Sequence, residues 1–238
     1  MKTATGPILI VDTATTRCVV GLTDAAGDLA AVASWDAGYR HGETLLPAIE
    51  RLLADAGVDR RTLAGIVVGT GPGAFTGLRV GIATTKGLAH GLGCPLVGVS
   101  TAEALLDAAS RDAAGDDADR SANGSVAGAP VLLLPAGPSD RIVVRRPAKP
   151  FLLVGGHDPE LDPGEWLVAV DLPGRAPADA LERGERARGR LAAGLAGIGV
   201  PRLAAGTETD AEIVPDYVTL PRGVHSEQGE VAWSRDPR

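Results

Sequence analysis

The chain has 238 residues, which is enough for one large domain or two small ones with a buried core. Hydrophobic residues make up 45% and charged residues 22% of the sequence, so an intrinsically disordered chain is excluded. The net charge of −7 and the 3% of aromatic residues argue against a chain that binds nucleic acid alone, which would need a basic surface and stacking rings.

Two cysteines, Cys18 and Cys94, lie far apart, and the chain has no CxxC motif and only four His. A cysteine-based zinc site is therefore not expected. Residues 1–7 lead directly into a predicted strand, without the apolar core of a signal peptide. No apolar run reaches the roughly 18 residues of a membrane span. We expect a cytoplasmic, reduced chain with no membrane contact.

The first elements predict an antiparallel meander followed by a helix. Short apolar runs at 8–11, 18–22 and 29–35 are separated by turns, which is typical of three sequential strands. A helix is expected from about Glu43 to Gly57. Its apolar stripe consists of Leu45, Leu46, Ile49, Leu52 and Leu53.

The next elements alternate. We predict a strand at 66–68, a glycine-rich turn at 69–77, a helix at 78–90, a strand at 96–99 and a third helix from Ser100 or Thr101 to Ala109. The order β-β-β-α-β-α-β-α is that of one lobe of the actin-like, ribonuclease-H-like fold. A dinucleotide-binding fold would begin with alternating βαβ units.

The second half is less regular. Residues 111–130 are small and polar, and we interpret them as an exposed flexible loop. Short strands follow at 131–134, 142–146, 151–154 and 167–170, with one charged helix at about 179–195. The predicted organisation is a first lobe over 1–110, a flexible loop over 111–130 and a smaller second lobe with a C-terminal segment over 131–238.

Two neighbouring segments could form a nucleotide site. Gly71 and Gly73 belong to a stretch, Gly69-x-Gly71-x-x-Ala74, that matches a loose phosphate-binding pattern. The acidic residue expected about 20 positions later is absent, and so is the lysine of a Walker A loop. The alternative is a strand-to-helix turn that needs glycine for positive φ.

The predicted hairpin after the first strand offers Asp12, Thr13 and Thr15. In actin-like ATPases this hairpin carries an Asp and hydroxyl residues that meet Mg²⁺ and phosphate. The alternative is a hydrogen-bonded turn.

The helix at 78–90 has an unusual number of small residues, including Ala83 and Gly87. Each interior Gly costs about 1 kcal/mol relative to Ala, and close approach of another backbone offsets such a cost. That backbone could belong to the same chain or to a partner. Arg79 and Lys86 on this helix form a solvated or partner-facing edge, and His41 is a cap or a partner contact rather than a general base.

Several motifs together resemble the TsaB (YeaZ) family of accessory subunits for the synthesis of threonylcarbamoyladenosine in bacterial tRNA. They are 8-ILIVDTAT-15, His41-x-x-x-Leu45-Leu46-Pro47, 69-GTGPGAFTGLRVG-81 and 86-KGLA-89. The resemblance covers about residues 8–107 and implies an α/β actin-like (ASKHA) fold with two lobes. It also implies a cytoplasmic role beside a catalytic paralogue, TsaD, and a small ATPase, TsaE.

The catalytic paralogue carries HxExH on the helix after the glycine-rich segment. The matching stretch here has Thr101 and Leu105 in place of the two His and keeps only Glu103. One carboxylate cannot replace a two-His site. The resemblance therefore implies no catalytic residue, no metal and no cofactor. The family's Asp-Ala-Arg motif is missing at 135–139, whereas 215-PDYV-218 resembles its closing segment.

The hypothesis is a non-catalytic subunit that activates the paralogue, forms a homodimer when alone and meets tRNA only through the complex. The alternatives are an ATP-hydrolysing or glycoprotease-like actin-fold enzyme acting alone, and a module that binds a mononucleotide between subunits. The predicted remnant of a nucleotide site consists of Asp12, Thr13, Thr15, Gly71 and Gly73. The predicted partner interface consists of His41, Leu45, Leu46, Ile49, Leu52, Arg79, Ala83, Lys86 and Gly87.

Overall fold

A computed structural model describes residues 6–38, 40–119, 128–206, 213–218, 224–227 and 230–233. Its larger sheet has the strand order β3-β2-β1-β4-β5. The bounds are β1 Ile8–Asp12, β2 Arg17–Thr23, β3 Leu29–Asp36, β4 Gly65–Gly69 and β5 Leu96–Val99. β1, β2 and β3 form the predicted antiparallel meander. β4 pairs with β1 in parallel, and β5 pairs with β4 in parallel.

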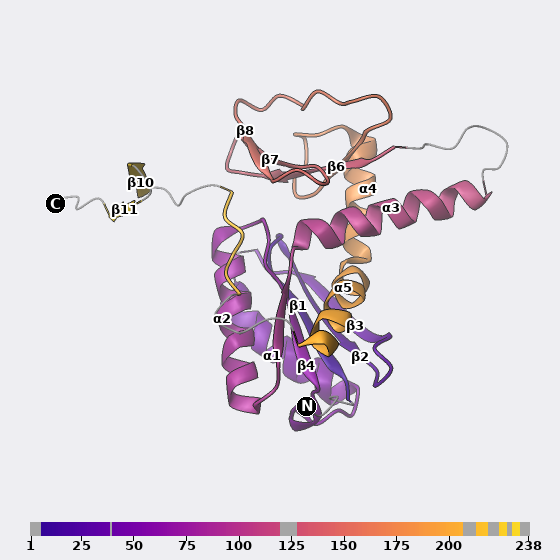
Figure 1. The fold of residues 1–238 in the computed structure, drawn as a ribbon, viewed down its shortest axis with the longest axis vertical. Helices are drawn as coiled ribbons and strands as arrows, with labels where there is room; N and C mark the ends of the chain where they lie inside the picture. The colour runs from indigo at the N-terminus through magenta and orange to yellow at the C-terminus, as the bar shows by residue number, and fades with distance from the viewer. Residues whose placement is uncertain are drawn as a thin grey trace.

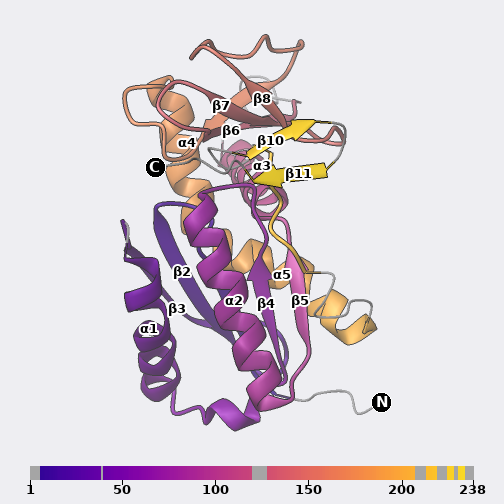
Figure 2. The ribbon, with the colours of Figure 1, turned by 90° about the vertical axis from the view of Figure 1, so that its left-hand side faces the viewer.

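Helices cover both faces of this sheet (Figures 1 and 2). Side chains alternate between the two faces of a strand, and in β1 Leu9 and Val11 join the core beneath α1 (His41–Asp55) and α2 (Phe75–Leu92). Ile8 and Ile10 join the core on the other face, beneath α5 (Leu191–Ala205). The short 3₁₀ helix Arg60–Thr62 connects α1 to β4.

The second sheet has the order β8-β7-β6-β9. Its bounds are β6 Pro130–Pro135, β7 Arg141–Val144, β8 Phe151–Leu153 and β9 Trp166–Ala169. Helix α4 (Ala178–Gly189) packs on β9, and α3 (Thr101–Asp119) contacts β6, α4 and α5. A separate antiparallel pair consists of β10 (Val224–Glu227) and β11 (Glu230–Trp233).

The predicted flexible loop over 111–130 is wrong in its first part, because α3 continues to Asp119. Residues 120–127 of that loop lie outside the described residues. The longer helix has a physical cause. Asp112, nearly buried, pairs with Arg186 and Arg190 at 2.7 Å each, and Arg111 pairs with Asp107 one turn earlier. This segment appears only polar in sequence. The ion pairs of Asp112 attach it to α4 and to the junction of α4 with α5.

The single helix predicted at 179–195 is two helices with a break at Arg190. The sequence changes there from charged to almost wholly apolar, and Gly189 has low helix propensity. α5 then lies on the first sheet, close enough that a Cβ at Gly199 would be 2.5 Å from the Val67 side chain. The predicted division between 1–110 and 131–238 therefore places α5 with the wrong sheet. None of the described helices is both long and apolar enough to cross a membrane.

Candidate functional site

The site is centred on Asp12, the last residue of β1. Its side chain is fully buried, and both oxygens are occupied. Oδ1 accepts the N–H of Ala14 at 2.9 Å, and Oδ2 accepts the hydroxyl of Thr101 at 2.6 Å. Burial, and to a smaller extent nearby Asp171, raises the pKa of Asp12 to about 6, against the lowering effect of these two hydrogen bonds. A Cβ at Gly69 would stand 1.8 Å from Oδ2, so β4 must end in glycine here.

The glycine-rich segment folds onto the β1–β2 turn. Gly71 has a φ of +101° and donates its N–H to Thr101 Oγ1 at 3.1 Å. A Cβ at Gly73 would lie 2.1 Å from the carbonyl oxygen of Ala14, and the next N–H, that of Ala74, donates to the same oxygen at 2.7 Å. These glycines thus allow positive φ and close backbone contact.

The structure brings Asp12, Thr13, Thr15, Gly71 and Gly73 together, as the sequence predicts. Their polar groups are satisfied within the chain. The Thr13 hydroxyl donates to the carbonyl of Gly77 at 2.8 Å, and that of Thr15 donates to the carbonyl of Arg17 at 2.9 Å. The side chains of Asp12, Thr13 and Thr15 are all buried. The geometry is that of a hydrogen-bonded turn against a close-packed loop. That these residues are a weak remnant of a nucleotide site stays a prediction.

The two residues that the resemblance matches to the paralogue's His ligands, Thr101 and Leu105, make structural contacts. The hydroxyl of Thr101 donates a hydrogen bond to Asp12, and Leu105 lies in the core. Glu103 is half exposed and approaches Arg202 at 3.5 Å. In the part of the chain that the structure describes, no three His, Cys, Asp or Glu side chains are grouped as metal ligands would be.

The predicted partner stripe on α1 is largely wrong. Leu45, Ile49 and Leu52 are buried in the core between α1, α2 and the sheet, so a partner cannot contact them. The stripe is wide because the helix covers the sheet and touches α2 as well. Leu46 is the exception, with 44% of its surface exposed. His41 is also buried, with Nε2 3.4 Å from the carbonyl oxygen of Thr15, and is not a surface contact.

The small residues of α2 face two directions. Gly77 and Gly81 face the β1–β2 turn, where a Cβ would lie 2.1 Å from the backbone oxygen and the hydroxyl of Thr13 respectively. Gly87 faces outward, and a Cβ there would meet nothing within 4 Å. Ala83 is exposed on the same side. Only the inward glycines are explained by close approach within the chain.

The two charged residues of the predicted interface differ. Arg79 is engaged within the chain: its guanidinium lies 3.7 Å from the centre of the Phe75 ring, and Nε donates to the Tyr217 hydroxyl at 2.9 Å. This contact fixes the 213–218 segment at the start of α2. Lys86 is partly exposed beside Gly87. Arg79 is nevertheless exposed, and the predicted role of Leu46, Arg79, Ala83, Lys86 and Gly87 in an interface stays a prediction.

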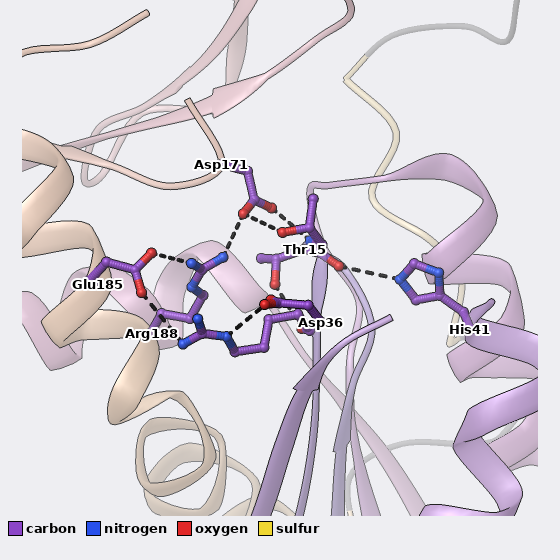
Figure 3. A network of polar contacts seen from close by, with 8 residues as sticks. Thr15, Asp36, His41, Asp171, Glu185 and Arg188 are labelled. Atoms are coloured by element: carbon purple, nitrogen blue, oxygen red, sulfur yellow. Dashed lines mark hydrogen bonds and ion pairs between the residues drawn. The ribbon is translucent and has the colours of Figure 1, made fainter. Parts of the chain in front are cut away.

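Sequence reasoning missed a polar network at the tip of the first hairpin (Figure 3). The carboxylate of Asp171, just beyond β9, accepts both the N–H and the hydroxyl of Thr16 at 2.7 Å. It also accepts Nη1 of Arg188, on α4, at 2.5 Å. A cavity of about 280 Å³ adjoins Thr16, Gly73 and Asp171. Asp171 lies 155 residues from Thr16, and no local pattern in the sequence connects them.

Known proteins resemble this chain most clearly in its first half. The family described as TsaD, tRNA N6-adenosine threonylcarbamoyltransferase, matches residues 35–118. The tRNA threonylcarbamoyladenosine biosynthesis protein TsaB of Escherichia coli is 36% identical over 105 residues, which are 44% of each chain. That of Haemophilus influenzae is 34% identical over 102 residues, 43% of this chain and 42% of that protein. The matches thus span less than half the length of these relatives.

The fold extends the resemblance along the chain. The structure of YeaZ from Pseudomonas aeruginosa matches with a TM-score of 0.62 and 24% identity, covering 89% of this chain and 99% of that one. This likeness confirms the predicted α/β class of fold, with two sheets and their helices. The first half of the chain is thus similar in sequence to TsaB proteins, and the chain shares the fold of the YeaZ structure.

Proposed function

We propose that the chain is a non-catalytic subunit of the complex that modifies tRNAs reading ANN codons. In this proposal it binds and activates TsaD, which transfers a threonylcarbamoyl group from threonylcarbamoyl-AMP to N6 of the adenosine next to the anticodon. TsaE is the third protein component. The sequence relatives, which are named for tRNA threonylcarbamoyladenosine biosynthesis, support a role in that process. The fold shared with YeaZ is consistent with it.

The observation that carries the non-catalytic role is the hydrogen bond between Thr101 and the buried Asp12. In the proposal, Thr101 replaces a metal-binding His, and its hydroxyl is committed to the buried carboxylate of Asp12. Leu105, at the second His position, is core. The polar groups that an enzyme would direct at a substrate are here directed at each other.

The net negative charge supports a tRNA contact made through partners. With a net charge of −7, the chain itself repels a polyanion. The exposed side of α2 around Gly87 supports the partner contact, because small residues allow a second helix to approach closely. In the absence of TsaD, the same side would pair with a second copy of the chain.

Reconstitution tests the proposal. The purified chain, TsaD and TsaE are mixed with unmodified tRNA and threonylcarbamoyl-AMP, and modified adenosine is measured with each protein omitted in turn. We expect no product from this chain alone and a large loss of product when it is left out. Product from the chain alone, or ATP hydrolysis by it that Asp12→Ala abolishes, would instead favour an enzyme acting alone.

A further inference from the structure

Arg79, in the second turn of α2, is exposed and yet held in a fixed place. Its guanidinium lies over the Phe75 ring, 3.7 Å from the ring centre, and Nε donates to the Tyr217 hydroxyl at 2.9 Å. The two rings are in contact with each other, with their centres 5.1 Å apart. One of the two Phe and one of the two Tyr in the whole chain are thus placed against a surface arginine.

The segment that carries Tyr217 is anchored to the first sheet. Ile213 is buried in the core beneath α1 and α2, and the N–H of Asp216 donates to the carbonyl of Thr70 at 2.8 Å. Figures 1 and 2 show the segment 213–218 running beside α2. The fold therefore brings Tyr217 to Arg79, and the contact does not depend on two flexible side chains meeting in solvent.

The guanidinium of Arg79 keeps hydrogen-bond donors free. Within the described ranges it uses only Nε and pairs with no carboxylate. Both Nη groups remain, and they form a planar fork that can bind a carboxylate or a phosphate through two parallel hydrogen bonds. Because Phe75 and Tyr217 already fix the side chain, an anion that binds there would cost little further conformational entropy.

The surface of α2 around Arg79 is basic, although the chain is acidic overall. No Asp or Glu occurs between Asp59 and Glu103, a stretch that contains all of α2. Lys86 lies two turns after Arg79 on the same side of the helix. It also has no carboxylate partner in the part of the chain that the structure describes. An anion that approaches this side of α2 meets no like charge on the helix.

The surroundings favour a protein carboxylate over the phosphates of a nucleic acid. Nucleic acid is bound by many basic side chains spread over a surface, whereas α2 offers Arg79 and Lys86 in a chain of net charge −7. One turn after Arg79 the exposed side continues with Ala83 and then Gly87, which are uncharged and suit a packed protein contact. Arg and Tyr are also among the residues that dominate protein interfaces.

We propose that Arg79 binds a carboxylate side chain of TsaD, and that Tyr217 is a positioning residue that holds the guanidinium in place for it. This assignment rests on the proposed function, in which TsaD is the partner of α2. It adds the chemistry of the contact, an Asp or Glu on the surface of the partner, and it gives the C-terminal segment 213–218 a role in binding.

Charge exchange between the two proteins tests the carboxylate. Calorimetry measures the affinity of the full chain for TsaD, for wild type and for Arg79→Glu. We expect Arg79→Glu to bind at least about 30-fold more weakly. One Asp→Arg or Glu→Arg variant of TsaD should restore part of the affinity for it. The matched control is Arg183→Glu on α4, which changes an arginine that also lies near a ring, that of Trp166, beside the second sheet. A folded Arg183→Glu should bind as wild type does.

A double-mutant cycle tests the positioning role. Tyr217→Ala should weaken the binding of TsaD to the wild-type chain but cost no further affinity when added to Arg79→Gln, because Tyr217 acts through the guanidinium. Tyr217→Phe, which keeps the ring and loses the hydroxyl, should have an intermediate affinity. Since Tyr217 is 38% exposed, all these variants should melt within a few degrees of wild type.

The outcomes separate the proposal from the proposed function. A wild-type chain that does not bind TsaD would refute the proposed function and this contact with it. A wild-type chain that binds TsaD no better than Arg79→Glu does would refute the contact alone. Arg79→Glu would then show its real occupant, a second copy if self-association is lost or a phosphate if the complex loses tRNA. The proposal is also overturned if no carboxylate exchange in TsaD restores binding, or if Tyr217→Ala costs as much affinity in Arg79→Gln as in wild type.

Discussion

At the scale of single residues, the chain places a carboxyl group where water cannot reach it. Asp12 has a pKa of about 6, whereas the ordinary value is 3.8, mainly because burial penalises the charged form. The folded state thus binds this proton more tightly than the unfolded state does. The contribution of Asp12 to stability is full below about pH 3.8 and is lost as the pH rises through about 6.

This sign gives a measurable pH dependence. A difference of about two pKa units corresponds to at most about 3 kcal/mol. We expect the free energy of unfolding of wild type, relative to Asp12→Asn, to fall by up to that amount between pH 4 and pH 7. Urea titrations of both proteins at pH 4, 5.5 and 7 measure it, and taking their difference cancels the other carboxyl groups. A difference that stays constant or grows with pH would contradict the assigned pKa.

Residue predictions from sequence succeed where a local motif brings the groups together. Asp12, Gly71 and Gly73 are adjacent because β1 and β4 are neighbouring parallel strands whose carboxyl ends share one edge. The contacts of this site could not be predicted, since the hydroxyl of Thr101 reaches Asp12, and the carboxylate of Asp171 reaches neighbouring Thr16, from distant segments. A lone Asp in a loop gives no sequence signal.

At the scale of elements, α2 has one side committed to the fold and one side open. Ala83 lies on the open side with Gly87. Ala83→Glu would place an unpaired charge in the proposed contact, where desolvation costs several kcal/mol. We expect binding to TsaD to weaken at least about 100-fold, since every 1.4 kcal/mol is tenfold. Calorimetry or size-exclusion chromatography of the mixed proteins measures the loss.

The matched control is Ala193→Glu on α5. Ala193 is also an exposed helical alanine, but α5 covers the opposite face of the sheet. Both variants should melt within a few degrees of wild type, because Ala and Glu differ little in helix propensity. Equal binding by Ala83→Glu and wild type would remove α2 from the interface. A variant that loses binding only because it unfolds would be recognised by its melting curve.

Helices and strands of the first half follow from periodicity, because their apolar patterns reflect burial on one sheet. The prediction fails where stability comes from ion pairs rather than from apolar residues. The end of α3 is polar in sequence, yet Asp112 attaches it to Arg186 and Arg190. α4 and α5 pack in different environments. The sequence does indicate the break between them, through Gly189 and the change from charged to apolar residues after it.

At the scale of the whole molecule, the two halves of the sequence share one core. The buried cluster on one face of the first sheet includes Ile10 and Val67 from the first half and Leu191 and Leu195 from α5. The network of Thr16, Asp171 and Arg188 joins the same halves by hydrogen bonds. A boundary placed by composition near residue 110 cannot detect either connection, because both join segments of the first half to segments far along the chain, α5 in the core and Asp171 with Arg188 in the network.

This sharing predicts that the first predicted lobe is not an independent folding unit. A fragment of residues 1–110 retains the five strands of the first sheet but lacks α5, so it would expose the apolar face that includes Ile8, Ile10 and Val67. An exposed apolar face of this kind promotes association. We expect the fragment to bind a hydrophobic dye, to aggregate and to melt without a cooperative transition. Joining residues 190–206 to it through a flexible Gly/Ser linker should restore the α5 contact and a cooperative melt. A fragment 1–110 that is monomeric and melts cooperatively without α5 would show that the first sheet needs no cover from the second half of the chain.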